Sequence, residues 1–288
     1  MEEKAMKRFW SLVLVMIMVV TALSGCGEQK KESANRLDEI LERGYITVAM
    51  EPYFAPCQFI DPSKEGDEQY VGSDVEFAKL IAEELGVECR IVPLDFTTVL
   101  SSVTEGKYDL AISALAWKPD REQNMNLSNS YYTSDEETDN GYSVAVRTDM
   151  LDQVTSIADL EDLVIVVQQG SLQQYFLEEQ VPKCKEVKYV SSTNDAFMMV
   201  SENKADAVIT ANAFARLYIE ANTECGLSLV ESFQFETDER MSGMVVGMKK
   251  GEDELTAKIN EIIAKVVADG TYMKWYEEYE AYAATLGL

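Results

Sequence analysis

The sequence contains no histidine among its 288 residues. This absence excludes Ser-His-Asp and Cys-His catalysis, and every metal site built on imidazole. The cysteines show no CxxC spacing, which argues against a zinc knuckle or a dithiol redox motif. We predict no metal, no cofactor and no catalytic residue, and acid–base work in an enzyme would fall to carboxylates or lysine. The pairing of four cysteines stays open: Cys57, Cys89, Cys184 and Cys225.

Positively charged residues are scarce, because 25 Lys and Arg stand against 51 Asp and Glu, for a net charge of −26. Such a chain repels nucleic acid and anionic lipid headgroups, so we predict no nucleic-acid partner. We interpret the excess of acidic residues as a source of solubility. With 47% hydrophobic residues, the chain is long enough for one large or two modest domains with packed cores.

A long hydrophobic run is also missing. The most apolar stretch, Phe9 to Val20, is short for a transmembrane helix and follows Lys7 and Arg8, a pattern typical of a signal peptide. The tetrapeptide LSGC at residues 23–26 resembles the lipobox of bacterial lipoproteins. This resemblance implies that residues 1–25 form a lipoprotein signal peptide. An ordinary signal peptide with a chance cysteine is the alternative.

Residues 26–36 are polar and lack apolar periodicity, so we interpret them as a flexible tether. In lipoproteins with such a lipobox, the residue at the position of Cys26 carries lipid, palmitate included, and becomes the new N-terminus. The resemblance therefore implies an extracytoplasmic protein anchored to the cell membrane through Cys26. The initiator stays open between Met1 and Met6, because two glutamates follow Met1.

Folding is predicted to begin near Leu37, with short helices alternating with short apolar strands. Such alternation is typical of parallel βαβ units. Asp74 precedes an apolar helical face and is predicted to cap a helix. The predicted helices are Leu37–Arg43, Asp74–Leu85 and Phe96–Thr104, and the predicted strands are Tyr45–Met50, Cys89–Pro93 and Leu110–Ser113.

A second series of elements follows the acidic, aperiodic segment Asp135–Asn140, which we interpret as an exposed connection. Predicted strands are Tyr142–Val146, Leu163–Val167, Val187–Val190, Ala207–Thr210, Leu227–Val230 and Met244–Met248. Predicted helices are Thr155–Leu160, Gly170–Glu179, Asn194–Ser201, Ala213–Ala221, Glu252–Ala268 and Thr271–Tyr282.

The two series share an internal repeat. Leu100–Ala114 reads LSSVTEGKYDLAISA, and Phe197–Ala211 reads FMMVSENKADAVITA, with eight corresponding positions. Each copy predicts a helix, a turn with Lys-x-Asp, and a buried strand, which favours two similar lobes. Ligands of open α/β sheets bind beyond the carboxyl ends of the strands. The predicted ends that face one cleft are Met50-Glu51, Ser113-Ala114, Gln168-Gln169 and Thr210-Ala211.

From Leu37 to Glu278 the chain resembles the family-3 solute-binding proteins, the polar amino-acid receptors of ABC importers. This resemblance implies the type II periplasmic-binding-protein fold, an α/β fold in which two lobes joined by two hinge connections enclose a ligand cleft. Lobe 1 would comprise residues 37–139 and 242–288, and lobe 2 residues 140–241. The motifs that carry the resemblance, in order, are Glu51–Pro56, Val71–Val75, Glu105–Asp109, Lys118–Arg121, Leu127–Ser128 before Tyr131-Tyr132, Gln168–Ser171, Lys204–Ala207 and Asp269–Tyr272.

The resemblance assigns one half of the site to a carboxylate. Arg121 stands where family members pair an arginine with the ligand carboxylate, and a guanidinium can meet a carboxylate bidentately. Gly170 and Ser171 begin a helix, whose free N–H groups and dipole favour the same anion. Ser113 and Ala114, at a strand end, are predicted to line the site beside them.

The other half of the site departs from the family pattern. Phe54 stands where the family stacks a ring on the ligand, and Trp117 either lines the cleft or packs at the hinge. Glu51 is a candidate contact for a cationic ligand end. Family members that bind amino acids carry an aspartate at the position of Ala211, so Asn212 or Glu51 would have to receive the ammonium, or the ligand lacks one.

The resemblance implies an extracytoplasmic receptor that captures an amino acid or a related small carboxylate by clamshell closure. It would act as a monomer and deliver its ligand to an ABC permease in the membrane. Two alternatives stay open. The same fold hosts a cyclohexadienyl dehydratase, an enzyme, and it also serves ligand-sensing proteins that signal to a membrane partner.

Overall fold

The structure, a computed structural model, describes residues 35–133 and 141–288. The predicted signal peptide, Cys26 and the acidic connection Asp135–Asn140 lie outside the described residues. Within the described ranges, no helix is both long and apolar enough to span a membrane.

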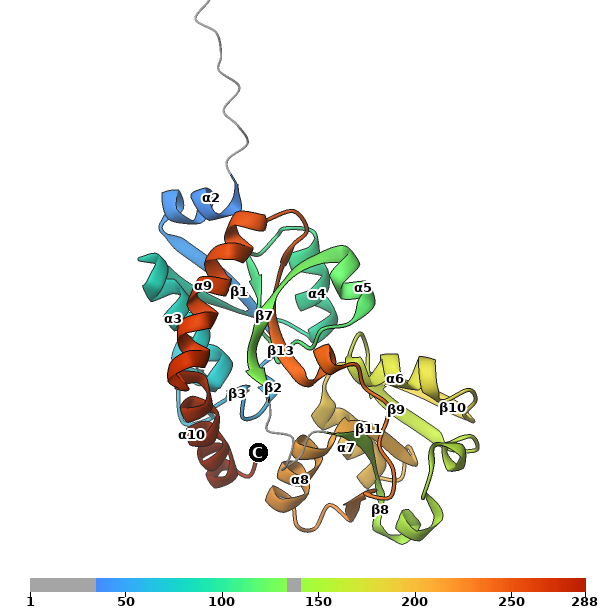
Figure 1. Ribbon diagram of the computed structural model, residues 1–288. Helices are drawn as coiled ribbons and strands as arrows, with labels where there is room; N and C mark the ends of the chain where they lie inside the picture. Colours follow the sequence, from blue (N-terminus) through green and yellow to red (C-terminus); the bar gives the residue numbers. More distant parts are fainter. Residues whose placement is uncertain (1–34, 134–140) are drawn as a thin grey trace, which may run out of the picture. The chain divides into compact units, whose positions relative to one another are not determined.

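A five-stranded sheet organises the first lobe (Figure 1). Strand β1 (Tyr45–Met50) pairs in parallel with both of its neighbours, as the βαβ pattern predicts. Two antiparallel strands complete the sheet, and one of them comes from near the C-terminus. In spatial order the strands are β5 (Glu88–Pro93), β1 (Tyr45–Met50), β6 (Leu110–Ala111), β13 (Gly243–Lys249) and β7 (Met125–Thr133).

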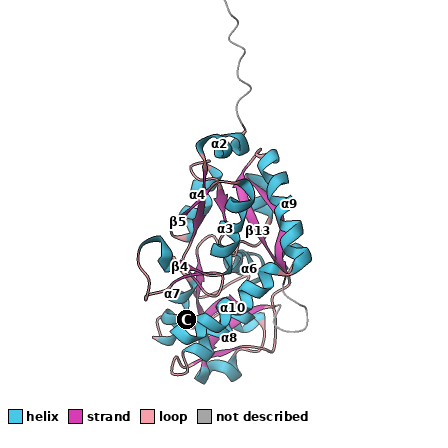
Figure 2. Ribbon diagram, turned by 90° about the vertical axis from the view of Figure 1, so that its left-hand side faces the viewer, coloured by secondary structure: helices cyan, strands magenta, loops and turns pink. Residues whose placement is uncertain are grey.

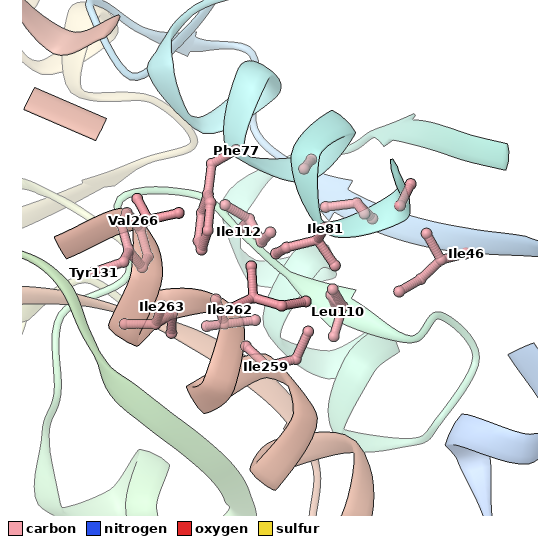
Figure 3. Close-up of a cluster of buried hydrophobic side chains, with 14 of the residues drawn as sticks. Ile46, Phe77, Ile81, Leu110, Ile112, Tyr131, Ile259, Ile262, Ile263 and Val266 are labelled. Atoms are coloured by element: carbon pink, nitrogen blue, oxygen red, sulfur yellow. The ribbon is translucent and has the colours of Figure 1, made fainter. Parts of the chain in front are cut away.

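Successive side chains of β1 point to opposite faces of this sheet, and both faces are buried. Val48 and Met50 join a core formed with helices α3 (Ser73–Leu85) and α9 (Asp253–Asp269). Ala49, between them, packs toward α4 (Phe96–Thr104) on the opposite face. Figure 3 shows the larger core, in which Phe77 and Ile81 of α3 approach the isoleucines of α9.

A second five-stranded sheet organises the second lobe. Two of its neighbouring pairs are parallel and two are antiparallel. Helix α6 (Leu172–Gln180) packs on one face, and α7 (Thr193–Ser201) and α8 (Asn212–Ala221) pack on the other. The spatial order is β10 (Glu186–Val190), β9 (Val164–Gln168), β11 (Ala207–Ala211), β8 (Tyr142–Arg147) and β12 (Leu227–Leu229).

Smaller elements surround the two sheets. Helix α10 (Thr271–Leu286) leaves α9 at Gly270 in a new direction, which Figure 2 shows clearly. A small antiparallel sheet, absent from the sequence prediction, follows β1 and comprises β2 (Tyr53–Phe54), β3 (Gln58–Ile60) and β4 (Tyr70–Val71). The remaining helices are α2 (Arg36–Arg43), α5 (Pro119–Asn124) and the 3-10 turns η1 (Gly66–Gln69), η2 (Thr148–Gln153), η3 (Ile157–Leu160) and η4 (Glu239–Ser242).

The internal repeat has the same backbone in both lobes. Gly106 and Asn203, at the same repeat position, both adopt a left-handed conformation, with φ of 77° and 59°. The next residue donates to a helix carbonyl at 2.8 Å in each copy, from Lys107 to Ser102 and from Lys204 to Met199. The repeat therefore encodes one helix-ending turn used twice.

The repeated aspartates also have one role. Asp109 accepts a hydrogen bond from the backbone N–H of Thr47 in β1 at 2.7 Å. Asp206 accepts one from the backbone N–H of Val164 in β9 at 2.8 Å. Each carboxylate thus ties the start of its own strand to the neighbouring strand. Asp109 also pairs with Arg43, and Asp206 lies 3.6 Å from Arg147.

Asp74 is not the helix cap that the sequence predicts. Helix α3 begins one residue earlier, with Gly72 as its cap at φ 128°. A Cβ at Gly72 would lie 2.2 Å from the carbonyl oxygen of Cys57, so only glycine fits this approach. The side chain of Asp74 instead turns into the core, where it is fully buried.

Candidate functional site

A cavity of about 420 Å³ lies between the two lobes. Its walls include the carboxyl ends of two strands from each sheet. Glu51 follows β1, and Ser113 and Ala114 follow β6, while Gln168 and Ala211 end β9 and β11. The structure therefore brings together the strand ends that the repeat pointed to, because parallel strands end at one edge of each sheet.

Arg121 reaches this cavity from helix α5 and is 4% exposed. Its Nη1 donates to the carbonyl of Ala116 at 2.6 Å, and its Nη2 donates to the carbonyl of Gly170, in the other lobe, at 2.7 Å. Its Nε finds no acceptor in the described part of the chain. Burial lowers the pKa of Arg121 to about 10, so the guanidinium stays charged at neutral pH.

The first turn of α6 forms the neighbouring wall, through Ser171, Leu172 and Gln173. The Oγ of Ser171 caps this helix by accepting from the N–H of Gln174 at 3.1 Å. Gly170 is not among the described lining residues, and its N–H donates to the side-chain oxygen of Gln174 at 2.7 Å. The positive end of the α6 dipole and the charge of Arg121 therefore act on the same part of the cavity, which favours an anion there.

Glu51 carries the opposite charge on the same cavity. It is 2% exposed, and its Oε1 has no hydrogen-bond partner among the described residues. Burial, reinforced by Asp195 and Asp95, raises the pKa of Glu51 to about 8, although a hydrogen bond with Gln168 opposes the shift. A bound cation would stabilise the charged form of this carboxyl, because an opposite charge lowers a carboxyl pKa.

A buried hydrogen-bond network shapes the wall at Ala114. This alanine has a φ of 46°, and its N–H donates to Oδ2 of Asp74 at 2.7 Å. The other oxygen of Asp74 accepts from Tyr131 at 2.9 Å and from Tyr272 at 2.7 Å. Asp74 therefore acts as a positioning residue that holds the loop after β6 in an unusual conformation.

The predicted site residues outside the strand ends have different placements. Phe54 lines the cavity, with its ring centroid 3.8 Å from that of Phe214. Trp117 packs with the second lobe's core, under the guanidinium of Arg240 at 3.5 Å, and is not among the lining residues described. Asn212 is 5% exposed and also lies off the lining, and its Oδ1 has no partner in the described ranges.

Several lining residues were not predicted from the sequence. They are mostly aromatic residues and methionines that pattern alone assigns to a core, together with two exposed glutamates of α10. Only one of them could have been found from the sequence. The family motif at Tyr131-Tyr132 ends on Tyr132, which lines the cavity. The unpredicted residues include Phe96, Tyr132, Tyr142, Phe214, Met241, Met244, Met273, Tyr276, Glu277 and Glu280.

Within the described ranges, no three His, Cys, Asp or Glu side chains gather into a possible metal site. The four cysteines of these ranges are free thiols: Cys57, Cys89, Cys184 and Cys225. The pairing of Cys184 with Cys225, which the sequence left open, is thus absent from the structure described.

Comparison with known proteins identifies the family. The model of the bacterial extracellular solute-binding proteins, family 3, matches residues 46–281. The chain belongs to this family. Like other family-3 solute-binding proteins, it is an extracytoplasmic substrate-binding receptor.

Its relatives include ABC transporter arginine-binding protein 1 of Escherichia coli, 26% identical over 81% of this chain and 90% of that protein. A similar solved structure is the amino acid ABC transporter substrate-binding protein AbpA of Streptococcus pneumoniae bound to L-arginine. That structure is 29% identical, has a TM-score of 0.75, and covers 85% of this chain and 98% of its own.

A second similar structure is the ancestral amino acid-binding protein AncCDT-1, described as a precursor of cyclohexadienyl dehydratase. It is 28% identical, with a TM-score of 0.71, and covers 85% of this chain and 99% of its own. These neighbours confirm the type II periplasmic-binding-protein fold with its two α/β lobes. The predicted residue limits of the lobes stay a prediction, since most of one connection lies outside the described residues.

Proposed function

We propose that this receptor serves an ABC importer and binds an amino acid with a positively charged side chain, with L-arginine as the first candidate. The observation that carries this proposal is a pair of opposite, incompletely partnered buried charges on one cavity. Arg121 has an unpaired Nε, and Glu51 has an unpaired Oε1. Buried charges are costly without a partner, so a ligand with both charges would satisfy both groups.

In the proposed complex, Arg121 and the first turn of α6 receive the ligand carboxylate, and Glu51 receives the positively charged group of the ligand side chain. Ala211 offers no carboxylate for an α-ammonium at the usual family position, which makes Glu51 the principal anionic contact. Glu277 and Glu280 add negative charge at the same cavity. The arginine-binding protein of Escherichia coli and the L-arginine complex of the Streptococcus pneumoniae protein support this choice of ligand.

Isothermal titration calorimetry with a matched ligand pair tests the proposal. L-citrulline has nearly the shape of L-arginine but no side-chain charge. We expect arginine to bind at least about 30-fold more tightly, because a desolvated charge pair contributes about 2 kcal/mol or more. Equal affinity for the two ligands would refute the role of the cation.

One substitution and a matched control test the carboxylate half of the site. Arg121→Ala should weaken arginine binding by about 100-fold or more, since it leaves the ligand carboxylate without its charged partner. Arg240→Ala is the matched control, because this exposed arginine lies over Trp117, away from the cavity lining. If Arg121→Ala bound as tightly as the wild type, the carboxylate assignment would be wrong.

We also propose the lipid anchor and the monomeric state. The lipobox at residues 23–26 supports lipidation of Cys26, which would hold the receptor at the membrane beside its permease. Metabolic labelling with a palmitate analogue should mark the wild type and not Cys26→Ser. A mass from light scattering that matches a dimer would contradict the monomer.

We propose that the receptor is not an enzyme, although Glu51 favours a second candidate. A buried carboxyl with a pKa of about 8 is suited to act as a general acid or base, and a dehydratase precursor is among the similar structures. Incubation with prephenate and arogenate decides between the two. Turnover that Glu51→Gln abolishes would establish the enzyme instead.

A further inference from the structure

A second cavity of about 540 Å³ lies beside the ligand cavity and differs from it in character. Its walls come from the small sheet of the first lobe, from α7 and α8 of the second lobe, and from the C-terminal residues. Most of its lining is apolar, with no charged side chain among the described residues that form it. The principal apolar residues are Tyr53, Phe59, Phe197, Met198, Leu217 and Leu286.

Phe54 and Phe214 are the only described residues that line both cavities. Phe54 comes from β2 of the first lobe, and Phe214 comes from α8 of the second, three residues after Ala211. Their ring centroids are 3.8 Å apart at an interplanar angle of 33°, so the rings are in contact. The pair therefore forms an aromatic wall between a charged cavity and an apolar one.

The wall also joins the lobes. Phe214 packs against the buried core of the first lobe, although its own helix belongs to the second. One face of the Phe54 ring is covered by Phe214, which limits how a ligand can stack on it. An extended apolar side chain could reach the second cavity only by separating the two rings, which would expose aromatic surface and disturb the contact between the lobes.

We propose that the wall formed by Phe54 and Phe214 determines specificity by excluding amino acids whose side chain ends in an apolar extension. This inference rests on the proposed function, because it concerns the far end of the same ligand cavity. Without the wall, the two cavities would become continuous. The site would then accept amino acids whose charged side chain carries an apolar extension.

Calorimetry with L-lysine and Nε-benzyl-L-lysine tests the wall. The benzyl amine keeps its positive charge, so the two ligands differ only in the apolar tail. We expect the wild type to prefer lysine by at least about 100-fold, and Phe214→Ala to reduce this preference by at least about tenfold. Leu217→Ala is the matched control, because Leu217 lies one turn further along α8 and lines only the apolar cavity.

Two milder variants keep the test valid if Phe214→Ala does not fold. Phe214→Leu and Phe54→Leu open the wall from opposite lobes, and each should reduce the preference by at least about threefold. An unchanged preference in every wall variant that folds would overturn the proposal. So would an equal reduction in Leu217→Ala, or a wild type that binds both ligands with similar affinity.

If the wild type binds no amino acid, the proposed function is refuted. The separation of the two cavities by the wall is then tested by dye fluorescence. The probe is then 1-anilinonaphthalene-8-sulfonate, whose sulfonate suits Arg121 and whose rings need the apolar cavity. Stronger emission with Phe214→Ala than with the wild type or Leu217→Ala would support the wall. Equal emission from the three proteins would overturn it.

Discussion

Replacing Glu51 by glutamine should make the ligand-free protein more stable, and the gain should grow with pH. Glutamine has nearly the same shape and carries no charge, so it removes the cost of ionising a buried carboxyl. Glu51 is 2% exposed, which means that solvent screens this cost very little. The site would thus retain a destabilising residue for the sake of its ligand.

The pKa of Glu51 fixes the sign of the effect. It rises from an ordinary value of 4.5 to about 8 in the fold, so the folded protein holds a proton that the unfolded chain releases. The free energy of unfolding therefore falls as the pH rises through this interval. At about 1.4 kcal/mol per pKa unit, the carboxyl destabilises the wild type by less than about 1 kcal/mol at pH 5 and by about 3 kcal/mol at pH 7.

Thermal unfolding followed by circular dichroism measures this gain. Both proteins are first unfolded, dialysed and refolded, because a ligand retained from the expression host would stabilise the wild type. For a chain of this size, a gain of about 3 kcal/mol at pH 7 corresponds to an increase in Tm of about 6–12 °C.

Glu277→Gln is the control for this experiment, since Glu277 lines the same cavity but is exposed. Its stability should stay within about 0.5 kcal/mol of the wild type at each pH. A Glu51→Gln variant whose advantage does not increase from pH 5 to pH 8 would refute the reasoning. So would a variant that is less stable than the wild type at pH 7.

Three further substitutions test other parts of the structure. Asp74→Asn replaces an acceptor of three hydrogen bonds, so it should lower the free energy of unfolding in urea by about 1–3 kcal/mol and weaken arginine binding. Unchanged affinity for arginine would exclude the positioning role of Asp74. Gly106→Ala should lower the free energy of unfolding by about 1–2 kcal/mol, because Gly106 has a φ of 77°. Gly106→Asn should lower it less, because Asn203 occupies the equivalent turn, and the reverse order would contradict the repeat. Arg240→Met should change stability by less than about 1 kcal/mol, because its side chain is 55% exposed, and a larger loss would show that its contacts matter more than expected.

Local patterns predicted much of the fold. Strand Tyr45–Met50 and helix Phe96–Thr104 match their predicted limits residue for residue, because apolar spacing and capping residues mark both elements. The internal repeat predicted two similar lobes, and both copies end in the same turn. These features depend on neighbours within a few residues, which a sequence displays directly.

Strand β7 was missed for a physical reason. Its sequence, MNLSNSYYT, is largely polar, because the strand lies at the edge of the sheet and exchanges polar contacts with α9. One such contact joins the N–H of Asn129 to the side chain of Asn260 at 2.7 Å. Register shifts along its pairing with β13 further disturb the alternation that would mark a strand.

The sequence predicted the site residues that belong to short motifs. It missed the roles that depend on contacts between residues far apart in the chain. Asp74 has the spacing of a helix cap, but its hydroxyl partners lie 57 and 198 residues away along the chain. Phe214 looks like an ordinary apolar helix residue until Phe54 of the other lobe is placed against it. Such pairings arise from tertiary packing, which no local pattern encodes.

Proton release on binding tests the central claim most directly. At pH 7, a carboxyl with a pKa of about 8 is about nine-tenths protonated, so a cation seated on Glu51 should expel close to one proton. Titration of L-arginine in two buffers of different ionisation enthalpy measures this number. We predict release of about 0.9 proton by the wild type and none by Glu51→Gln. Equal heats in both buffers for the wild type would contradict a cationic ligand bound at Glu51.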